Sequence, residues 1–407
     1  MFVKNSAWTL LGFGVRIGIK SVYFILIARE LGPTEYGKFI AIIALVSILV
    51  PFSSWGSGNI LVKHVSRDKS KFNEYWGAAL STTLISGTVL CCIVILIYGL
   101  FLPSNISVYS VIAISTADLI FGRIVDVSIM AFLAFEKMKK MTSLQIISSI
   151  LLMLFAIVQL LLPARPTVES WSFYYLFSFI IIALISFWFV SRDLGWGVMN
   201  PLPIWNEFGE GFLFSIGISS QSFYNDFDKT MLSKLNGEAV AGIYSAAYKI
   251  INLLFVPVYS LMYAAYPRFF KFGEKGIKYS TRWAIKLLFI SIGYSFLTLP
   301  VIFMISKFII LILGSEYSET ATALIWLCPL VFLKSAHCFP ADALTGSGKQ
   351  SIRSVVQIIV AVINVGINLY LIPIYGWRGA AVASIISDSI LGILLWILII
   401  YQIKKNE

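Results

Sequence analysis

Long apolar stretches separated by short polar connections dominate the pattern of this chain. A helix rises about 1.5 Å per residue, so about 20 apolar residues cross a hydrocarbon core that is about 30 Å thick. The pattern therefore predicts an all-α integral membrane protein with twelve transmembrane helices. The expected helices cover residues 8–28, 36–62, 75–101, 106–133, 142–162, 170–190, 207–233, 238–266, 280–305, 319–342, 351–373 and 378–402.

Composition supports this assignment and leaves no room for a sizeable soluble domain. Of the 407 residues, 58% are hydrophobic and only 13% are charged, and the mean hydropathy is +0.87, which is far above the range of water-soluble proteins. The four cysteines lie inside apolar stretches and lack the spacing of a zinc site or a disulfide framework. We expect no metal and no cofactor, and a first helix that is retained rather than removed as a signal peptide.

The connections between the predicted helices alternate between rich and poor in lysine and arginine. By the positive-inside rule, the basic connections are cytoplasmic, which places both termini in the cytoplasm. A net charge of +11 could indicate a nucleic-acid partner, but the residues that carry it lie in short connections at helix ends. Membrane topology explains the charge, and no nucleic-acid binding is predicted.

An internal repeat divides the chain into two halves. Residues of the first half recur about 205 to 212 positions later, at offsets that vary little. The matched residues are Leu31 with Leu235, Gly37 with Gly242, Ala41 with Ala246, Pro51 with Pro257, Lys137 with Lys349, and Pro163 with Pro373. We predict an N-terminal lobe of six helices over 1–192, a cytoplasmic linker rich in Gly and Pro over 193–206, and a C-terminal lobe over 207–407. Because six is even, the lobes are related by a pseudo-two-fold axis along the membrane normal, around a central cleft, as in alternating-access transporters.

Five basic residues fall deep within the predicted spans: Arg16, Lys20, Arg123, Lys249 and Lys334. Each costs about 2.5 to 3.5 kcal/mol at a helix centre on insertion scales, so we expect them to face water or a partner inside the protein. Arg16 and Lys20 are four residues apart and share one helix face. The alternative for these two is a first helix that begins later, which would place them at the interface.

Two of the predicted helices also carry carboxylates. In 106–133, Asp118 and Asp126 flank Arg123, and Arg123 could neutralise Asp126 three residues away as a structural pair. The helix over 207–233 is unusually polar and is expected to line the cleft. Its Asp226 or Asp228 could exchange a proton. The alternative is a pair between Asp226 and Lys229 at the outer mouth.

Polar residues near the C-terminus favour internal pairing over function. Lys334, His337 and Asp342 could form a relay, although pairing within the protein explains them more simply. Asn364 and Asn368 lie four residues apart and are expected to hydrogen-bond between helices. Asp388 has no evident partner in its own span.

Three sequence patterns carry a resemblance to a known family. They are Arg29-Glu30-Leu31-Gly32-Pro33-Thr34-Glu35-Tyr36-Gly37, then Gly237-Glu238-Ala239-Val240-Ala241-Gly242-Ile243-Tyr244-Ser245-Ala246-Ala247, and then Leu369-Tyr370-Leu371-Ile372-Pro373-Ile374-Tyr375-Gly376-Trp377-Arg378-Gly379-Ala380-Ala381. With these patterns the chain resembles the polysaccharide and O-antigen flippases (Wzx-like) of the multidrug/oligosaccharidyl-lipid/polysaccharide exporter superfamily. The resemblance covers nearly the whole chain.

The resemblance implies a flippase of the bacterial inner membrane that serves O-antigen or lipopolysaccharide biosynthesis. It would move oligosaccharide linked to undecaprenyl diphosphate from the cytoplasmic to the periplasmic leaflet, by alternating access coupled to H⁺ or Na⁺. A diphosphate is a strong anion that arginine and lysine can bind in place of water. The candidate substrate-binding residues are Arg16, Lys20, Arg123 and Lys249. The candidate coupling carboxylates are Asp226, Asp228, Asp118 and Asp126.

Two other classes of function remain open. A multidrug exporter of the same superfamily would need an acidic cavity for cations, whereas the predicted interior is basic or balanced. An O-antigen polymerase or membrane glycosyltransferase would be expected to carry a large external loop or an α/β domain, and neither is predicted here. We therefore predict a transporter rather than an enzyme.

Overall fold

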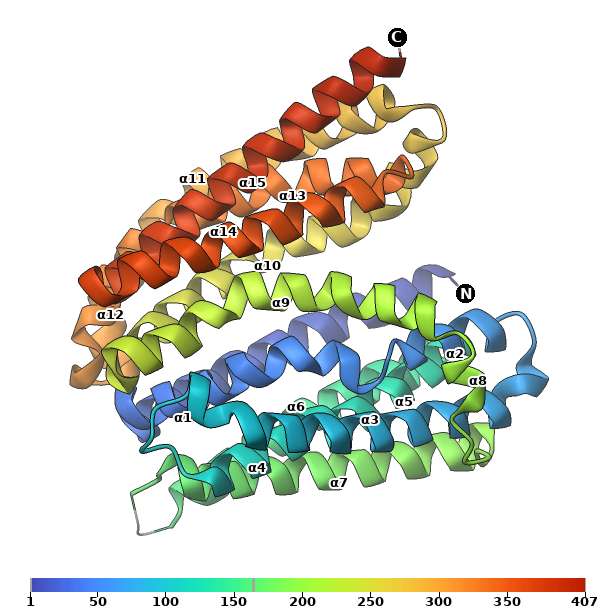
Figure 1. Ribbon diagram of the computed structural model, residues 1–407, viewed down its shortest axis with the longest axis horizontal. Coiled ribbons are helices and arrows are strands. Elements are labelled where there is room, and N and C mark those ends of the chain that lie inside the picture. The colour runs from blue at the N-terminus through green and yellow to red at the C-terminus, as the bar shows by residue number, and fades with distance from the viewer. Residues whose placement is uncertain (1, 163–164, 407) are drawn as a thin grey trace. The chain divides into compact units, whose positions relative to one another are not determined.

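The computed structural model describes residues 2–162 and 165–406, and the regular elements in this part of the chain are all helical (Figure 1). The longer helices are α1 (Phe2–Ser53), α2 (Ser57–Val65), α3 (Phe72–Phe101), α4 (Val108–Thr116), α5 (Gly122–Ala134), α6 (Met138–Leu160), α7 (Val168–Leu194), α9 (Phe208–Asn236), α10 (Glu238–Gly273), α11 (Ile277–Leu313), α12 (Ser318–Leu327), α13 (Pro329–Gly346), α14 (Gln350–Tyr375) and α15 (Trp377–Asn406). The shorter elements are η1 (Lys69–Lys71), η2 (Ala117–Phe121), α8 (Leu202–Trp205) and η3 (Ser315–Tyr317).

Eight segments of the described chain are long and apolar enough to cross a membrane, or nine if the bent pair α12 and α13 forms one span. The prediction of an all-helical multi-pass membrane protein is confirmed at this level. The boundary predicted between the first two helices is also present. It lies at Gly32, whose φ of 68° and ψ of 171° interrupt α1, a conformation that glycine adopts without steric cost.

Two predicted helices are interrupted where the sequence analysis expected continuity. The helix predicted over 36–62 breaks after Ser53, where Trp55 and Gly56 have positive φ values of 47° and 65°. The helix predicted over 319–342 bends by 45° between α12 and α13. That bend lies at Pro329, which lacks the N–H group that would continue the helical hydrogen bonds.

The chain forms two compact units, Met1–Thr230 and Met231–Glu407. The first unit includes most of α9, which hydrogen-bonds to backbone carbonyls of α1. Ser215 Oγ donates to Pro51 O at 2.9 Å, Ser219 Oγ to Ile48 O at 2.7 Å, and Thr230 Oγ1 to Ala41 O at 3.1 Å. The division into lobes over 1–192 and 207–407 with a linker over 193–206 stays a prediction.

The connection between α7 and α8 is packed onto α3. The Val198 N–H donates to Asn73 O at 2.9 Å. A side chain on Gly197 would place its Cβ 2.6 Å from the backbone nitrogen of Gly77, so the two segments approach closely because both positions are glycine. The Gly residues of this connection therefore serve packing.

Glu207, the residue before α9, contacts two side chains of α2. Its carboxylate accepts a hydrogen bond from Lys63 at 2.9 Å and lies 2.5 Å from His64 Nε2. Partial burial acts to raise the pKa of Glu207, but the hydrogen bond from Lys63 and the contacts with His64 outweigh it and lower the pKa. The carboxylate is thus held in its charged form.

In the second unit, Asn364 joins α14 to α15, as predicted. Asn364 Nδ2 donates to Ser387 Oγ at 3.0 Å, whereas Asn368 Nδ2 donates to Asn364 Oδ1 at 2.9 Å within α14. In the same unit Tyr244 of α10 lies 3.1 Å from Ser384 of α15 through their hydroxyl groups. Because hydrocarbon offers no alternative partners, these bonds fix how the three helices are rotated.

The close packing of α13 on α10 can be tested by substituting Gly346. A Cβ at this position would lie 2.5 Å from the carbonyl carbon and oxygen of Phe269, and backbone atoms cannot rotate away. We expect Gly346→Ala to reduce stability by about 1 to 3 kcal/mol, measured as a lower melting temperature of the purified protein in detergent.

The matched control is Gly366→Ala in α14, where a Cβ would meet nothing within 4 Å. Alanine favours helix over glycine by up to about 1 kcal/mol, so this variant should melt at the wild-type temperature or above. Equal losses in the two variants would contradict the packing argument.

Candidate functional site

A π-helical turn, η2 (Ala117–Phe121), joins α4 to α5 and carries Asp118. Regular α-helix precedes the turn and follows it along the chain. Isolated π-helical turns are rare and are frequent at functional sites. Asp118 is ten residues into this joined helix, or about 15 Å along its axis, and so lies well inside the membrane region.

Tyr175 of α7 is the hydrogen-bond partner of Asp118. Its hydroxyl group donates to Asp118 Oδ1 at 2.8 Å. Tyr175 is itself held by aromatic neighbours. The ring of Phe39 meets it edge-on at 5.4 Å between centroids, and Trp171, one turn earlier on α7, packs against both Tyr23 and Tyr175. The aromatic cluster therefore fixes the direction of a neutral donor toward a buried carboxylate.

Charged side chains of α1 and α5 surround this carboxylate. Arg123 and Asp126 form an ion pair with 2.6 Å between Nη2 and Oδ2. The positive charges of Arg123 and Lys20 and the negative charge of Asp126 all act on Asp118. We name Lys20, Asp118, Arg123 and Asp126, together with Tyr175, the Asp118 cluster. The structure thus brings four of the eight candidate residues together within the first unit.

The other four candidate residues lie elsewhere. Arg16 is half-buried on α1, one turn before Lys20, as predicted from the spacing of four. Lys249 is exposed on α10 in the second unit. Asp226 and Asp228 of α9 both lie near Lys229, with N···O distances of 2.7 and 3.7 Å. Pairing of Asp226 with Lys229 was the structural alternative, and a coupling role for either carboxylate stays a prediction.

Sequence reasoning missed the two features that define the Asp118 cluster. A π-helical turn has no distinct hydropathy pattern, because one extra residue per turn does not change the apolar content of the segment. Tyr175 lies in an aromatic-rich stretch that is typical of any membrane helix. The one available signal was a hydroxyl-bearing ring deep in an apolar run, since a buried tyrosine usually finds a hydrogen-bond partner.

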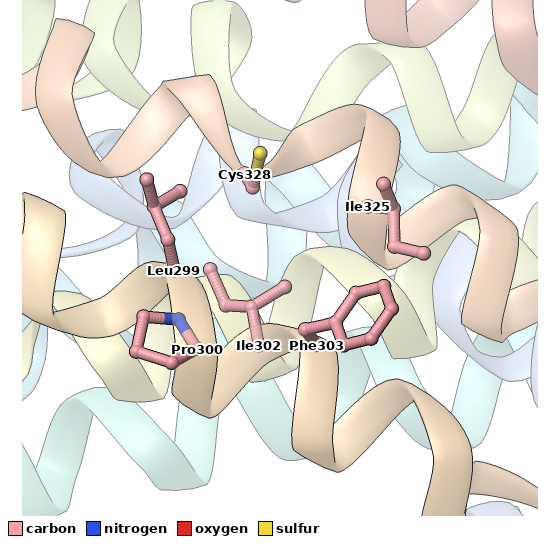
Figure 2. Close-up of a pocket in the computed structure, with 6 residues that line it drawn as sticks. All are labelled: Leu299, Pro300, Ile302, Phe303, Ile325 and Cys328. Atoms are coloured by element: carbon pink, nitrogen blue, oxygen red, sulfur yellow. The ribbon is translucent and has the colours of Figure 1, made fainter.

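The second unit also contains an apolar hollow of about 380 Å³ between α11 and α12 (Figure 2). Its lining residues are Leu299, Pro300, Ile302, Phe303, Ile325 and Cys328. None of these side chains carries a charge, so the hollow has no group that could replace the water around an anion. It is not a candidate for recognition of a charged headgroup.

Comparison with known proteins shows the family. The family model described as "Polysaccharide biosynthesis protein" matches residues 2–272. The chain belongs to the polysaccharide biosynthesis protein family. A second model, MatE, matches residues 215–370. A curated relative, an uncharacterized membrane protein of Methanocaldococcus jannaschii, is 21% identical, and the match covers 99% of this chain and 84% of that protein.

Solved structures show the fold. The lipid II flippase MurJ in an inward closed conformation matches with a TM-score of 0.78 and 13% identity, over 99% of this chain and 87% of that one. An inward-facing multidrug resistance MATE family transporter of the MOP superfamily matches with a TM-score of 0.76 and 16% identity, over 98% of both chains. A MOP superfamily transporter from Pyrococcus furiosus, whose description notes a binding pocket of reversed polarity, matches with a TM-score of 0.64 and 18% identity, over 98% and 96%.

These findings confirm the family resemblance drawn from the sequence. The protein is a multi-pass membrane protein of the polysaccharide biosynthesis protein family, with a MATE- and MurJ-like fold. The prediction of a transporter agrees with this fold. The expected location in a bacterial inner membrane stays a prediction, since the curated relative is archaeal.

The bond between Tyr175 and Asp118 is tested by Tyr175→Phe. Removing the hydroxyl leaves a buried carboxylate without its donor, which should cost about 1 to 3 kcal/mol and lower the melting temperature in detergent. Tyr174→Phe is the matched control. The neighbouring Tyr174 packs on Phe155, so its change should stay within about 0.5 kcal/mol. In an Asp118→Asn background the Tyr175→Phe loss should shrink, and an unchanged loss would contradict a direct bond.

Proposed function

We propose that this member of the polysaccharide biosynthesis protein family is a flippase for oligosaccharide linked to undecaprenyl diphosphate. It would carry the lipid-linked unit from the cytoplasmic to the periplasmic leaflet of a bacterial inner membrane, for O-antigen or another surface polysaccharide. The observation that carries the proposal is the set of basic side chains around Asp118, with Lys20 and Arg123 inside the membrane region of a family named for polysaccharide biosynthesis.

The proposed transporter crosses the membrane twelve times. The segment Gly14–Val65 has 52 residues, or about 78 Å of helix, which is too long for one span and is interrupted at Gly32. We count it as two crossings. The joined helix from α4 through η2 to α5, the 29-residue helix α9 and the bent pair α12 and α13 provide one each. Added to the other seven candidate segments, these give the predicted number.

Lys20 and Arg123 suit a diphosphate because both side chains are cationic and neither is fully buried. Lys20 is exposed, and the Arg123 side chain keeps 25% of its accessible area despite its pair with Asp126. A guanidinium can exchange a carboxylate partner for a phosphate without losing its charge-assisted bonds. Arg123 would therefore release Asp126 when substrate binds. Arg16, one turn away on α1, joins the proposed anion-binding residues of the first unit, and Lys249 of α10 is a separate candidate in the second unit.

Asp118 is the strongest of the four proposed coupling carboxylates. Among the described residues its hydrogen-bond partner is a neutral tyrosine, whereas Asp126, Asp226 and Asp228 lie within 4 Å of a lysine or arginine. A carboxylate whose direct hydrogen-bond partner is neutral can take up and release a proton without breaking an ion pair. One proton that crosses a potential of 100 mV supplies about 2.3 kcal/mol. Na⁺ remains the alternative coupling ion.

Flipping of a fluorescent undecaprenyl-diphosphate oligosaccharide in proteoliposomes tests the substrate. We expect Arg123→Ala to slow flipping by about 10- to 100-fold, since charged hydrogen bonds contribute about 1.5 to 3 kcal/mol. Arg16→Ala should act in the same direction. Asp126→Ala retains the guanidinium and should slow flipping much less than Arg123→Ala does. Lys307→Ala, which removes a lysine that packs on Phe303 in α11, serves as a neutral control.

Two results would contradict this assignment. Equal losses in Arg123→Ala and Asp126→Ala, together with lower melting temperatures, would make the ion pair structural. Export of a cationic dye by wild-type protein that does not flip the lipid would favour a multidrug exporter, the alternative that shares this fold.

The coupling role of Asp118 is tested in the same liposomes with an imposed pH gradient, acidic on the side that receives the oligosaccharide. Wild-type flipping should accelerate with the gradient, and Asp118→Asn should lose most of that stimulation because an amide cannot exchange a proton. Glu169→Gln, which changes an exposed carboxylate in the first turn of α7, should retain it. Full stimulation of Asp118→Asn would exclude Asp118 from coupling.

A further inference from the structure

The second unit contains a buried pair that the proposed mechanism does not use. His337 lies in the middle of α13, and Asp388 lies on α15, which packs against α13. Nε2 of His337 is 3.5 Å from Oδ1 of Asp388, and the two side chains are only 13% and 3% exposed. From the sequence, Lys334, His337 and Asp342 could form a relay, and Asp388 has no evident partner in its own span. The structure supplies that partner.

Both side chains lie far from the membrane surface. Asp388 is 11 residues after Trp377, the first residue of α15, which corresponds to about 16 Å of helix. His337 is eight residues into the 18-residue helix α13. Nε2 of His337 is buried and forms no hydrogen bond among the described residues, and Oδ1 of Asp388 lies 3.5 Å from it.

The remaining charged groups around the pair have partners of their own. On α13, Lys334 reaches α10, where its ammonium group lies 3.1 Å from Asn252 Oδ1 and over the ring of Tyr248. Also on α13, Asp342 faces Arg353 of α14 at 3.7 Å.

The polar groups on the helices packed around α13 and α15 are neutral or already bonded. The thiol of Cys338 lies 3.8 Å from Nδ1 of His337. On α11, the Tyr294 hydroxyl donates to Leu254 O. On α12, Glu319 accepts from the Trp377 indole. The positive charges of Lys334 and Arg353 act on His337, and Asp388 is the anion that faces it.

We infer that His337 and Asp388 together form a binding site for one exchangeable proton in the second unit. With one proton the pair is neutral overall, either as imidazolium with carboxylate or as imidazole with carboxylic acid. Without it, a carboxylate remains in a site of low polarity beside a neutral ring, which costs several kcal/mol. The proton comes from water and returns to water, and no other co-reactant is required.

This arrangement makes proton occupancy depend on the state of the helices. While α13 and α15 stay packed, losing the proton leaves a buried charge, so the pair retains it. When water reaches the pair, the carboxylate is solvated and the proton can leave. The site would respond to water access at one side of the membrane, as a coupled transporter requires. The inference does not depend on which substrate the protein carries.

The composition of the chain allows a direct test, because it contains only two histidines. His64→Gln leaves His337 as the single imidazole of the full-length protein. In lipid nanodiscs, ¹⁵N-histidine NMR between about pH 5 and pH 9 follows its protonation. We expect a single reversible titration. In addition, Asp388→Asn should weaken the affinity of the ring for its proton at least about tenfold, because the opposite charge is gone.

Two further variants separate this site from simple packing. Asp342→Asn changes a neighbouring buried carboxylate that pairs with Arg353, and it should leave the titration of His337 nearly unchanged. Asp388→Glu retains a carboxylate and should preserve the titration even if Asp388→Asn folds poorly. A ring that does not respond to pH in either wild-type or Asp388→Asn protein would overturn the inference. The same conclusion would follow if Asp342→Asn and Asp388→Asn shifted the titration equally.

Discussion

The constraint on which the structure depends is that hydrocarbon provides no partners for polar groups. Every charge placed inside the membrane must therefore be neutralised or hydrogen-bonded by the protein itself. Arg123 with Asp126, Lys229 with Asp226 and Arg353 with Asp342 meet this requirement as ion pairs. Each pair is neutral overall, which lowers the free-energy cost of burying its two charges between packed helices.

Two buried carboxylates meet the same constraint in a different way. Asp118 accepts a hydrogen bond from a tyrosine, and Asp388 faces a histidine. Neither partner carries a permanent charge, so the protonation of each site can change without breaking a fixed ion pair. One of these sites lies in each compact unit. The transport cycle proposed above would need groups of this kind, because an ion pair that stays closed does not change its protonation when water reaches it.

Irregular backbone contributes to the same arrangement. The π-helical turn at Ala117–Phe121 carries Asp118, the interruption at Gly32 lies within the first family pattern, and the bend before Pro329 precedes the helix of His337. Each irregularity frees backbone groups that a regular helix would pair internally, and such departures cost free energy unless the surroundings stabilise them. At η2 the irregular turn itself carries Asp118, and it presents this side chain to Tyr175 rather than to lipid.

The sequence by itself determined the features that depend on spacing along one helix. Hydropathy gave the membrane class and the boundary between the first two helices, the family patterns gave the family, and a separation of three residues gave the Arg123 and Asp126 pair as one alternative. The tertiary structure decided the contacts between helices. Asp118 and Tyr175 are 57 residues apart, and His337 and Asp388 lie on helices separated by α14. Whether such residues meet depends on the rotation of each helix about its axis, and an apolar helix with similar residues on all sides encodes that rotation only through packing against its neighbours.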